Sequence, residues 1–155
     1  MTFSKLAIYF QRLDRTTKRL EITAILAELI KSASASEIDK ILYLAAGRLG
    51  PLFNNTEFNL ADKMMFRVLA VAYNKTPAEI EKLYQKSGDI GDLASSLPSL
   101  SSSPSSLSVS ETYNSLLDIA SDSGSGSQDR KVQKFATLLK KVDALSAKYL
   151  VRIPL

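Results

Sequence analysis

Apolar residues recur at intervals of three and four along most of this chain, which is the spacing of one buried face of an α-helix. Phe3, Leu6, Phe10 and Leu13 show this spacing at the start of the chain. No stretch before residue 150 alternates apolar and polar residues as a half-buried strand does. The pattern therefore predicts an all-α protein of about seven or eight helices.

The second helix, expected over residues 17–31, would bury Leu20, Ile25, Leu29 and Ile30 by the same spacing. Capping side chains mark several other helix starts, because their oxygens can accept hydrogen bonds from the open N–H groups of a first turn. Thr76, Pro77 and Glu79 have the pattern of a capping box, and Ser108 with Glu111 repeats its spacing. The further caps expected are Ser36 before the third helix, Asn59 before residues 60–73, and Asp89 before a short helix at 90–96.

Residues 95–108 contain nine serines and two prolines in fourteen positions. Such a composition buries too little apolar surface to offset the entropy of ordering the chain, so we expect a flexible connection here. We expect one helical domain over residues 1–155, with one lobe at about 1–94 and a second at 109–155. A weak echo of Leu29-Ile30-Lys31 in Leu138-Leu139-Lys140 favours two pseudo-symmetric lobes, the second truncated at its C-terminal end.

The chain contains no histidine and no cysteine. This excludes Ser–His and Cys–His catalysis, His-based zinc sites and disulfides within the chain. No apolar run approaches the roughly 20 residues of a membrane span, so we expect a soluble protein without a membrane partner. Asp89 and Asp92 make only a weak acid/base or metal pair, because no third ligand accompanies them.

The net charge of +4 is unevenly distributed. Residues 1–31 hold six Lys/Arg and three Asp/Glu, residues 128–155 hold seven and two, and the intervening residues hold seven and eleven. If the two ends fold side by side, they form one cationic surface suited to a polyanion. The alternatives are scattered cations that keep a helical surface solvated and, for Arg19, pairing with a nearby carboxylate.

The stretch 123–131 reads Ser-Gly-Ser-Gly-Ser-Gln-Asp-Arg-Lys and leads into a helical pattern near Arg130. Glycines allow close backbone approach, and open N–H groups at a helix start favour an anion, so the stretch is suited to binding phosphate. It is not a nucleotide P-loop, because Lys131 follows Arg130 and precedes Val132 instead of standing in Gly-Lys-Ser/Thr. The alternative is a solvated Gly/Ser linker followed by ordinary helix charges.

Five motifs in order resemble the N-terminal DNA-binding domain of ATP-dependent DNA ligases of the archaeal and eukaryotic type. They span essentially the whole chain. The motifs are Thr17–Glu21, the Tyr43-Leu44 and Gly47–Pro51 pair, Lys86–Gly91, Ser123–Lys131 after a low-complexity connection, and Ala147–Arg152. The resemblance implies a helical domain with approximate two-fold symmetry that sits over the minor groove beside a nick.

By the same resemblance the chain would serve an enzyme that seals nicks in DNA replication, repair and recombination. Its partners would be nicked duplex DNA, downstream adenylation and oligonucleotide-binding domains and, as a further candidate, a sliding clamp. The location implied is intracellular, cytoplasmic in a prokaryote and nuclear in a eukaryote. The residues expected to touch DNA are Lys18, Arg19, Gly124, Gly126, Ser127, Gln128, Arg130, Lys131, Lys134 and Arg152.

The chain departs from the family pattern at its end. It stops at Leu155, before the Gly-x-Leu-Arg-x-Gly turn of the family, and it contains no Lys-x-Asp-Gly motif for adenylation. We therefore expect no catalytic, cofactor-binding or metal-binding residues here, with ATP and Mg²⁺ belonging to the parent enzyme. DNA affinity without the missing turn is expected to be reduced.

The mechanism expected is recognition of the phosphate backbone, because the sequence offers no recognition helix and no apolar wedge. The variant Arg130→Glu with Lys131→Glu is expected to abolish duplex binding while leaving helicity intact. The alternative function is a helical protein–protein interaction module without a DNA role, which would bind a partner through apolar grooves with little dependence on salt.

Overall fold

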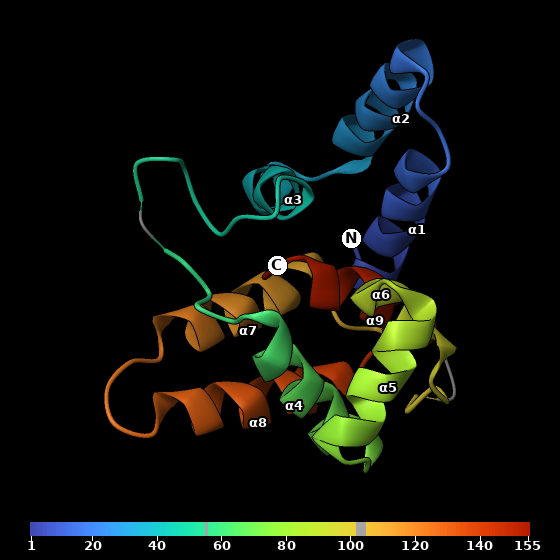
Figure 1. Cartoon of the computed structure of the whole chain (residues 1–155). Coiled ribbons are helices and arrows are strands. Elements are labelled where there is room, and N and C mark those ends of the chain that lie inside the picture. The colour runs from blue at the N-terminus through green and yellow to red at the C-terminus, as the bar shows by residue number, and fades with distance from the viewer. Residues whose placement is uncertain (55, 102–104) are drawn as a thin grey trace.

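The computed structural model describes residues 1–54, 56–101 and 105–155, and nine helices lie within these ranges (Figure 1). The all-α prediction is confirmed, with slightly more helices than expected. In the described part of the chain, β pairing is limited to one isolated antiparallel bridge between Thr2 and Ser108. The helices are α1 (Phe3–Asp14), α2 (Arg19–Ser32), α3 (Ile38–Ala45), α4 (Asp62–Tyr73), α5 (Pro77–Ser87), α6 (Ile90–Ser96), α7 (Val109–Ser121), α8 (Ser127–Leu139) and α9 (Ala144–Arg152).

Three of the expected caps are confirmed. Thr76 and Ser108 each form a complete capping box with the glutamate three residues later, and the Asp89 side chain accepts from the Asp92 amide. Two others are wrong. Asn59 adopts a left-handed conformation with a φ of 51°, so the chain turns there and α4 begins after Ala61. The Ser36 hydroxyl bonds to another serine, and Glu37 is the residue before α3.

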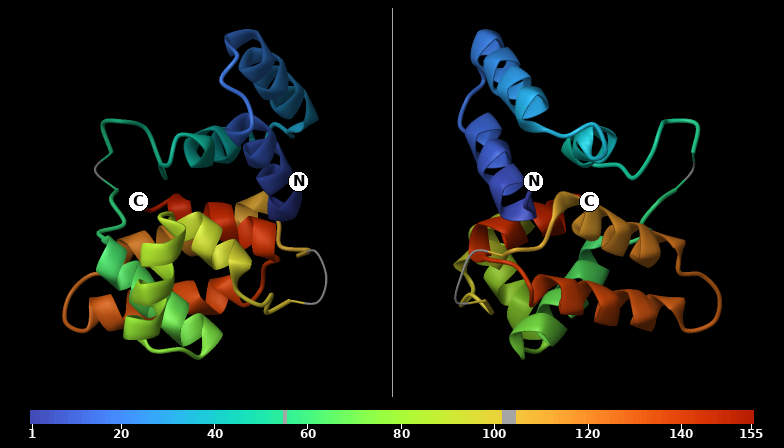
Figure 2. Two further views of the ribbon diagram at one scale, coloured as in Figure 1. Left: turned by 45° about the vertical axis from the view of Figure 1, so that its right-hand side comes forward. Right: turned by 180° about the vertical axis from the view of Figure 1, so that it is seen from behind.

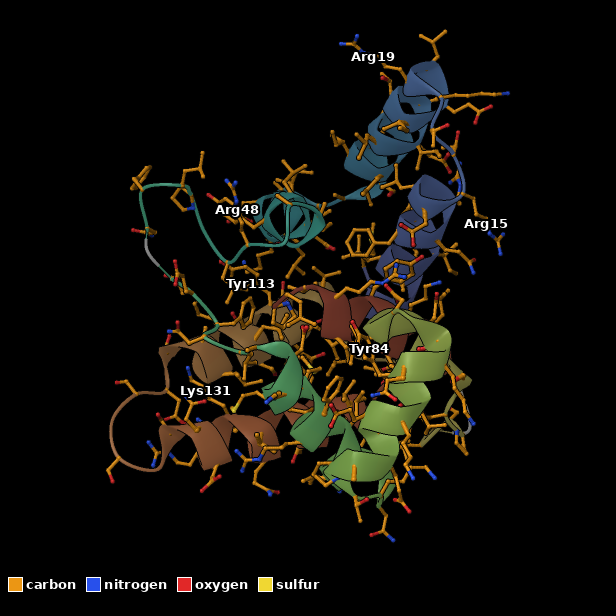
Figure 3. The ribbon with its side chains drawn as sticks, in the orientation of Figure 1. Arg15, Arg19, Arg48, Tyr84, Tyr113 and Lys131 are labelled. Carbon is orange, nitrogen blue, oxygen red and sulfur yellow. The ribbon has the colours of Figure 1, made fainter. Side chains whose placement is uncertain are left out.

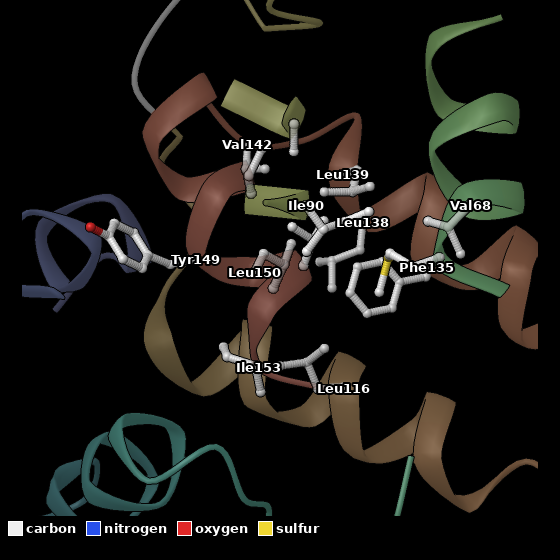
Figure 4. Close-up of a cluster of buried hydrophobic side chains, with 14 of the residues drawn as sticks. Val68, Ile90, Leu116, Phe135, Leu138, Leu139, Val142, Tyr149, Leu150 and Ile153 are labelled. Atoms are coloured by element: carbon white, nitrogen blue, oxygen red, sulfur yellow. The ribbon is translucent and has the colours of Figure 1, made fainter. Parts of the chain in front are cut away.

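Helices α4 to α9 form the main body of the molecule. Helix α6 packs along α9, α4 packs along α8, and α7 packs along α8. Their apolar faces meet in a common core, shown in Figure 4. Elements before and after the Ser-rich stretch therefore share one core, which includes Val68, Ile90, Leu116, Phe135, Leu139 and Leu150.

The Ser-rich stretch is ordered at both ends. Helix α6 continues to Ser96, and the Leu97 side chain is buried. At the other end Phe3 donates to the Leu107 carbonyl at 2.9 Å, and Val109 donates to the Met1 carbonyl at 2.9 Å. Residues 102–104 lie outside the described residues, so the flexible connection and the two-lobe division stay predictions.

Helix α2 stands at the outer end of the molecule, away from α4 to α9 (Figures 1 and 2). It packs on α1 and buries only Ile25 and Leu29. The prediction that Leu20 and Ile30 face the core is wrong, since Leu20 is 86% exposed and Ile30 is 47% exposed. Periodicity identified this helix but not how much of its apolar surface the fold covers.

Candidate nucleic-acid interface

The Gly/Ser stretch forms the turn between α7 and α8. Gly124 and Gly126 have φ values of 88° and 75°, a left-handed conformation that costs glycine little. Helix α8 begins at Ser127, three residues before the expected start. No side chain caps it, and the amides of Gln128 and Asp129 have no acceptor among the described residues. The start of α8 therefore presents open N–H groups that favour an anion.

Arg130 holds this turn in shape. Its guanidinium donates to Asp122 Oδ1 at 2.8 Å, to the Ser125 carbonyl at 2.7 Å and to the Ser123 carbonyl at 3.1 Å. Lys134 approaches the other Asp122 oxygen at 3.1 Å and Asp118 at 3.0 Å. Both cations are thus paired with carboxylates, and Arg130 fixes the loop conformation that exposes the start of α8.

Asp122 is expected to stay ionised far into the acid range. Hydrogen bonds from Arg130 and then Lys134, against the opposing effect of burial, lower the pKa of Asp122 from 3.8 to about 2. Because this pKa is lower than in the unfolded chain, the pairing stabilises the fold above pH 3.8 and is lost as the pH falls through about 2. An NMR titration of the Asp122 carboxyl should show that low midpoint.

Arg130→Gln should return the midpoint towards 3.8, the value of an unpaired aspartate. A midpoint near 3.8 in the unmodified protein would contradict the pairing of Arg130 with Asp122.

Lys131 points inward, away from solvent. It is 3% exposed, and its Nζ donates to the Phe58 carbonyl at 3.0 Å. This contact fastens the segment between α3 and α4 to α8. Direct contact with a phosphate would require Lys131 to leave its buried position. In this structure Lys131 instead lies beneath the candidate interface and holds the segment between α3 and α4 against α8.

Arg152 lies in a carboxylate network where α1, α6 and α9 meet. It approaches Asp14 and Asp89 at 2.8 Å each, and the Tyr149 hydroxyl donates to Asp14 at 2.9 Å. Burial opposes ionisation of Asp89, but the hydrogen bond and charge of Arg152 and the hydrogen bonds from the Asp92 and Gly91 amides together outweigh it and lower the pKa of Asp89. Arg152 therefore joins three helices, and its charge is largely neutralised within the fold.

The turn from α1 to α2 carries three exposed cations, of which Arg15 and Arg19 form no ion pair among the described residues. The side chains of Arg15 and Arg19 are exposed and form no hydrogen bond or ion pair among the described residues. Lys18 lies before the first turn of α2, and its Nζ is 3.7 Å from Glu21 Oε1, a long separation for an ion pair. No side chain caps α2. We call Arg15, Lys18 and Arg19 the α1–α2 corner.

The expected single cationic surface does not form. Helices α1 and α9 do lie side by side, with the Phe10 and Tyr149 rings 5.6 Å apart. However, Arg19 lies at the free end of α2 and Lys131 lies on α8, at widely separated points of the molecule (Figure 3). Local spacing could not show this, because α2 turns away from the body after residue 15.

Two exposed arginines were not among the expected interface residues. Arg15 ends α1, and Arg48 follows α3, with no ion pair among the residues that the structure describes. The Gly-Arg-Leu-Gly turn at 47–50 was the available signal for Arg48. Within the described ranges no group of three or more acidic side chains could hold a metal ion, and no helix there is long and apolar enough to cross a membrane.

Comparison with known proteins matches residues 2–155 to the family model described as DNA ligase N terminus. A probable DNA ligase of Dictyoglomus thermophilum is 42% identical over 155 residues, covering 100% of this chain and 26% of that protein. The DNA ligase of Sulfolobus acidocaldarius is 39% identical over 164 residues, covering 98% of this chain and 27% of its own length. A probable DNA ligase of Aquifex aeolicus is 39% identical over 154 residues, covering 98% of this chain and 26% of that protein. The chain thus spans about a quarter of the length of these curated relatives.

Proposed function

Because this chain belongs to the DNA ligase N-terminus family, we propose that it binds duplex DNA as one part of a DNA ligase. It contacts the sugar–phosphate backbone across the minor groove beside a nick and does not recognise the base sequence. Adenylation, which uses ATP and Mg²⁺, belongs to another part of the enzyme. The work of such an enzyme lies in DNA replication, repair and recombination inside the cell, where a sliding clamp is a further candidate partner.

The observation that carries this proposal is the free charge of the α1–α2 corner. Its three cations are exposed, and the one ion pair there has a separation of 3.7 Å. A pair this long and this exposed contributes little, so it competes weakly with a phosphate. Neutralising phosphates releases condensed counterions from DNA, which supplies affinity independent of sequence.

The start of α8 supports the proposal as a second contact. Its open amides can donate to a phosphate oxygen, as helix N-termini commonly do. Asp129 in the first turn would oppose an anion, but Arg67 from α4 pairs with its carboxylate at 2.5 Å. Ser127, Gln128 and the two left-handed glycines then form the accessible part of this contact, while Arg130, Lys131 and Lys134 hold it in place.

A second candidate function is a protein-interaction module without a DNA role. The exposed apolar side chains favour it, since Leu20, Leu52 and Phe53 are between 77% and 86% exposed. Such a module would bind its partner through apolar contact, and its affinity would depend little on salt. The free cations of the α1–α2 corner favour the DNA proposal over this one.

The variant Lys18→Gln with Arg19→Gln tests the DNA proposal. If each cation neutralises one phosphate, the slope of log affinity against log salt for a nicked duplex should fall in magnitude by roughly 1.8. Fluorescence anisotropy at several salt concentrations measures this slope. Because both side chains are exposed, the circular dichroism spectrum should not change.

The matched control is Lys82→Gln with Lys86→Gln on α5. This pair removes the same charge from exposed positions outside the proposed interface. Its slope should equal that of the unmodified protein. If the α1–α2 corner variant and the unmodified protein have equal slopes of log affinity against log salt, the corner does not contact DNA and the proposal for it is contradicted.

A further inference from the structure

The segment between α3 and α4, described at residues 46–54 and 56–61, is fastened in both of these parts. On one side Leu49 is buried, and the Tyr113 hydroxyl of α7 donates to its carbonyl. On the other side Phe58 is buried, and Lys131 of α8 donates to its carbonyl at 3.0 Å. Burying a lysine without a hydrogen-bond acceptor costs free energy. The hydrogen bond from Lys131 to the Phe58 carbonyl therefore constrains the position of this segment.

The middle of the same segment carries two apolar side chains into solvent. Leu52 is 77% exposed and Phe53 is 85% exposed, on a turn in which Asn54 donates to the Pro51 carbonyl at 3.0 Å. Residues 48–54 stand out from the helices in every view (Figures 1 and 2). An anchored segment that presents adjacent leucine and phenylalanine side chains is suited to contact a partner. We call Leu52 and Phe53 the apolar tip.

The surroundings of the apolar tip are polar and carry one exposed cation, Arg48, and one exposed acid, Glu57. Arg48 lies on the α3 side of the segment without an ion pair among the described residues (Figure 3). Residues 47–56 contain no acidic residue. Beside the tip is an open hollow of about 650 Å³ whose walls include Arg48, Leu52 and Asn54, with Glu57 on the side of the segment that leads to α4. On the Arg48 side of the tip, a free cation beside apolar side chains complements a polyanion better than it complements a purely apolar protein surface.

We propose that the apolar tip is a wedge that enters the minor groove of DNA at the nick, with Arg48 on an adjacent phosphate. Phenylalanine and leucine are among the side chains that proteins insert between base steps from the minor groove. A nick interrupts one strand, so the base step there opens at lower cost than in continuous duplex. The wedge rests on the proposed DNA-binding function, and it would favour nicked over intact duplex.

Phe53→Ala separates an apolar contact from a charged one. Loss of the ring should weaken binding to nicked duplex about tenfold at every salt concentration, because a base–aromatic contact neutralises no phosphate and so releases no counterion. The slope of log affinity against log salt should not change. Arg48→Gln should instead lower the magnitude of that slope by roughly 0.9, the effect of one lost phosphate contact.

The matched control is Leu100→Ser, which removes an exposed leucine from the Ser-rich stretch. Residues 97–101 of that stretch lie on the opposite side of the molecule from residues 46–54 in the views of Figures 1 and 2, and Leu100 is 40% exposed. DNA binding by this variant should equal that of the unmodified protein. Circular dichroism should show that all three variants keep their helices, because all three side chains are exposed.

A fluorescent base analogue, 2-aminopurine, next to the nick gives a direct readout of base opening. Its fluorescence should rise when the unmodified protein binds, and it should rise much less with Phe53→Ala at saturating protein. Equal affinity and equal fluorescence for the two proteins would overturn the wedge and leave Phe53 as a protein-contact residue. Absence of duplex binding by the unmodified protein would instead overturn the proposed function itself.

Discussion

Lys131→Glu should lower the free energy of unfolding by about 3–5 kcal/mol, the range found when a buried charge loses its partner. Lys131 is 3% exposed, and its ammonium group donates to the Phe58 carbonyl. A carboxylate at this position would face a carbonyl oxygen with no donor and little water. Urea unfolding followed by far-ultraviolet circular dichroism measures the loss.

Two variants separate burial from charge in this prediction. Lys131→Met keeps the length of the side chain and removes the donor, so it should cost only about 1–2 kcal/mol. Arg130→Glu changes the charge of the exposed neighbour, which is paired with Asp122, and should cost less than Lys131→Glu. If Lys131→Glu unfolds at the same urea concentration as the unmodified protein, the buried position of Lys131 is contradicted.

The same burial changes the interpretation of the double variant Arg130→Glu with Lys131→Glu. The sequence led us to expect that it would lose DNA binding and keep its helicity. With Lys131 beneath the segment between α3 and α4, loss of binding by this variant would follow from loss of structure as well. The α1–α2 corner variants are free of this ambiguity because their side chains are exposed.

Gly91→Ala should destabilise the protein by about 2 kcal/mol, within the range for overpacking a filled site. Gly91 lies in α6 where that helix packs along α9. A β-carbon there would lie 2.4 Å from Arg152 Nε and 2.8 Å from the Lys148 carbonyl oxygen. The arginine side chain can shift, but the carbonyl belongs to the backbone of α9, so the two helices must separate. Thermal and urea unfolding both report this change.

Gly50→Ala is the matched control for this substitution. A β-carbon at Gly50 would meet its nearest atom, Asn54 Nδ2, at 3.6 Å, which is ordinary van der Waals contact. Its stability should therefore stay within about 0.5 kcal/mol of the unmodified protein. Equal stability of the Gly91 and Gly50 variants would contradict the close approach of α6 and α9.

Most helix positions could be predicted from the sequence because their signals are local. The capping boxes at Thr76 and Ser108 depend on residues three positions apart, and the structure has both. The wrong cap at Asn59 had the correct residue type, but its backbone is left-handed and its neighbours Phe58 and Leu60 are both buried, which the local pattern does not show.

Whether each cation is paired, buried or exposed without a partner could not be predicted from local spacing. Arg130 and Lys131 are neighbours in the sequence, yet one holds a surface turn and the other is buried against a carbonyl 73 residues away. Arg152 pairs with Asp14 across 138 residues. The Arg19 side chain has no partner among the described residues, because α2 leaves the body of the molecule. These differences depend on contacts between distant segments, which the charge pattern along the chain does not contain.

The most direct test of the central claim is a titration of the unmodified protein with nicked duplexes of two unrelated sequences over a series of salt concentrations. Backbone recognition predicts equal affinity for both within about twofold and a log–log salt slope near −2.7 or steeper, if three or more phosphates are neutralised. Absence of binding at low salt, or an affinity that does not change with salt, would contradict the account.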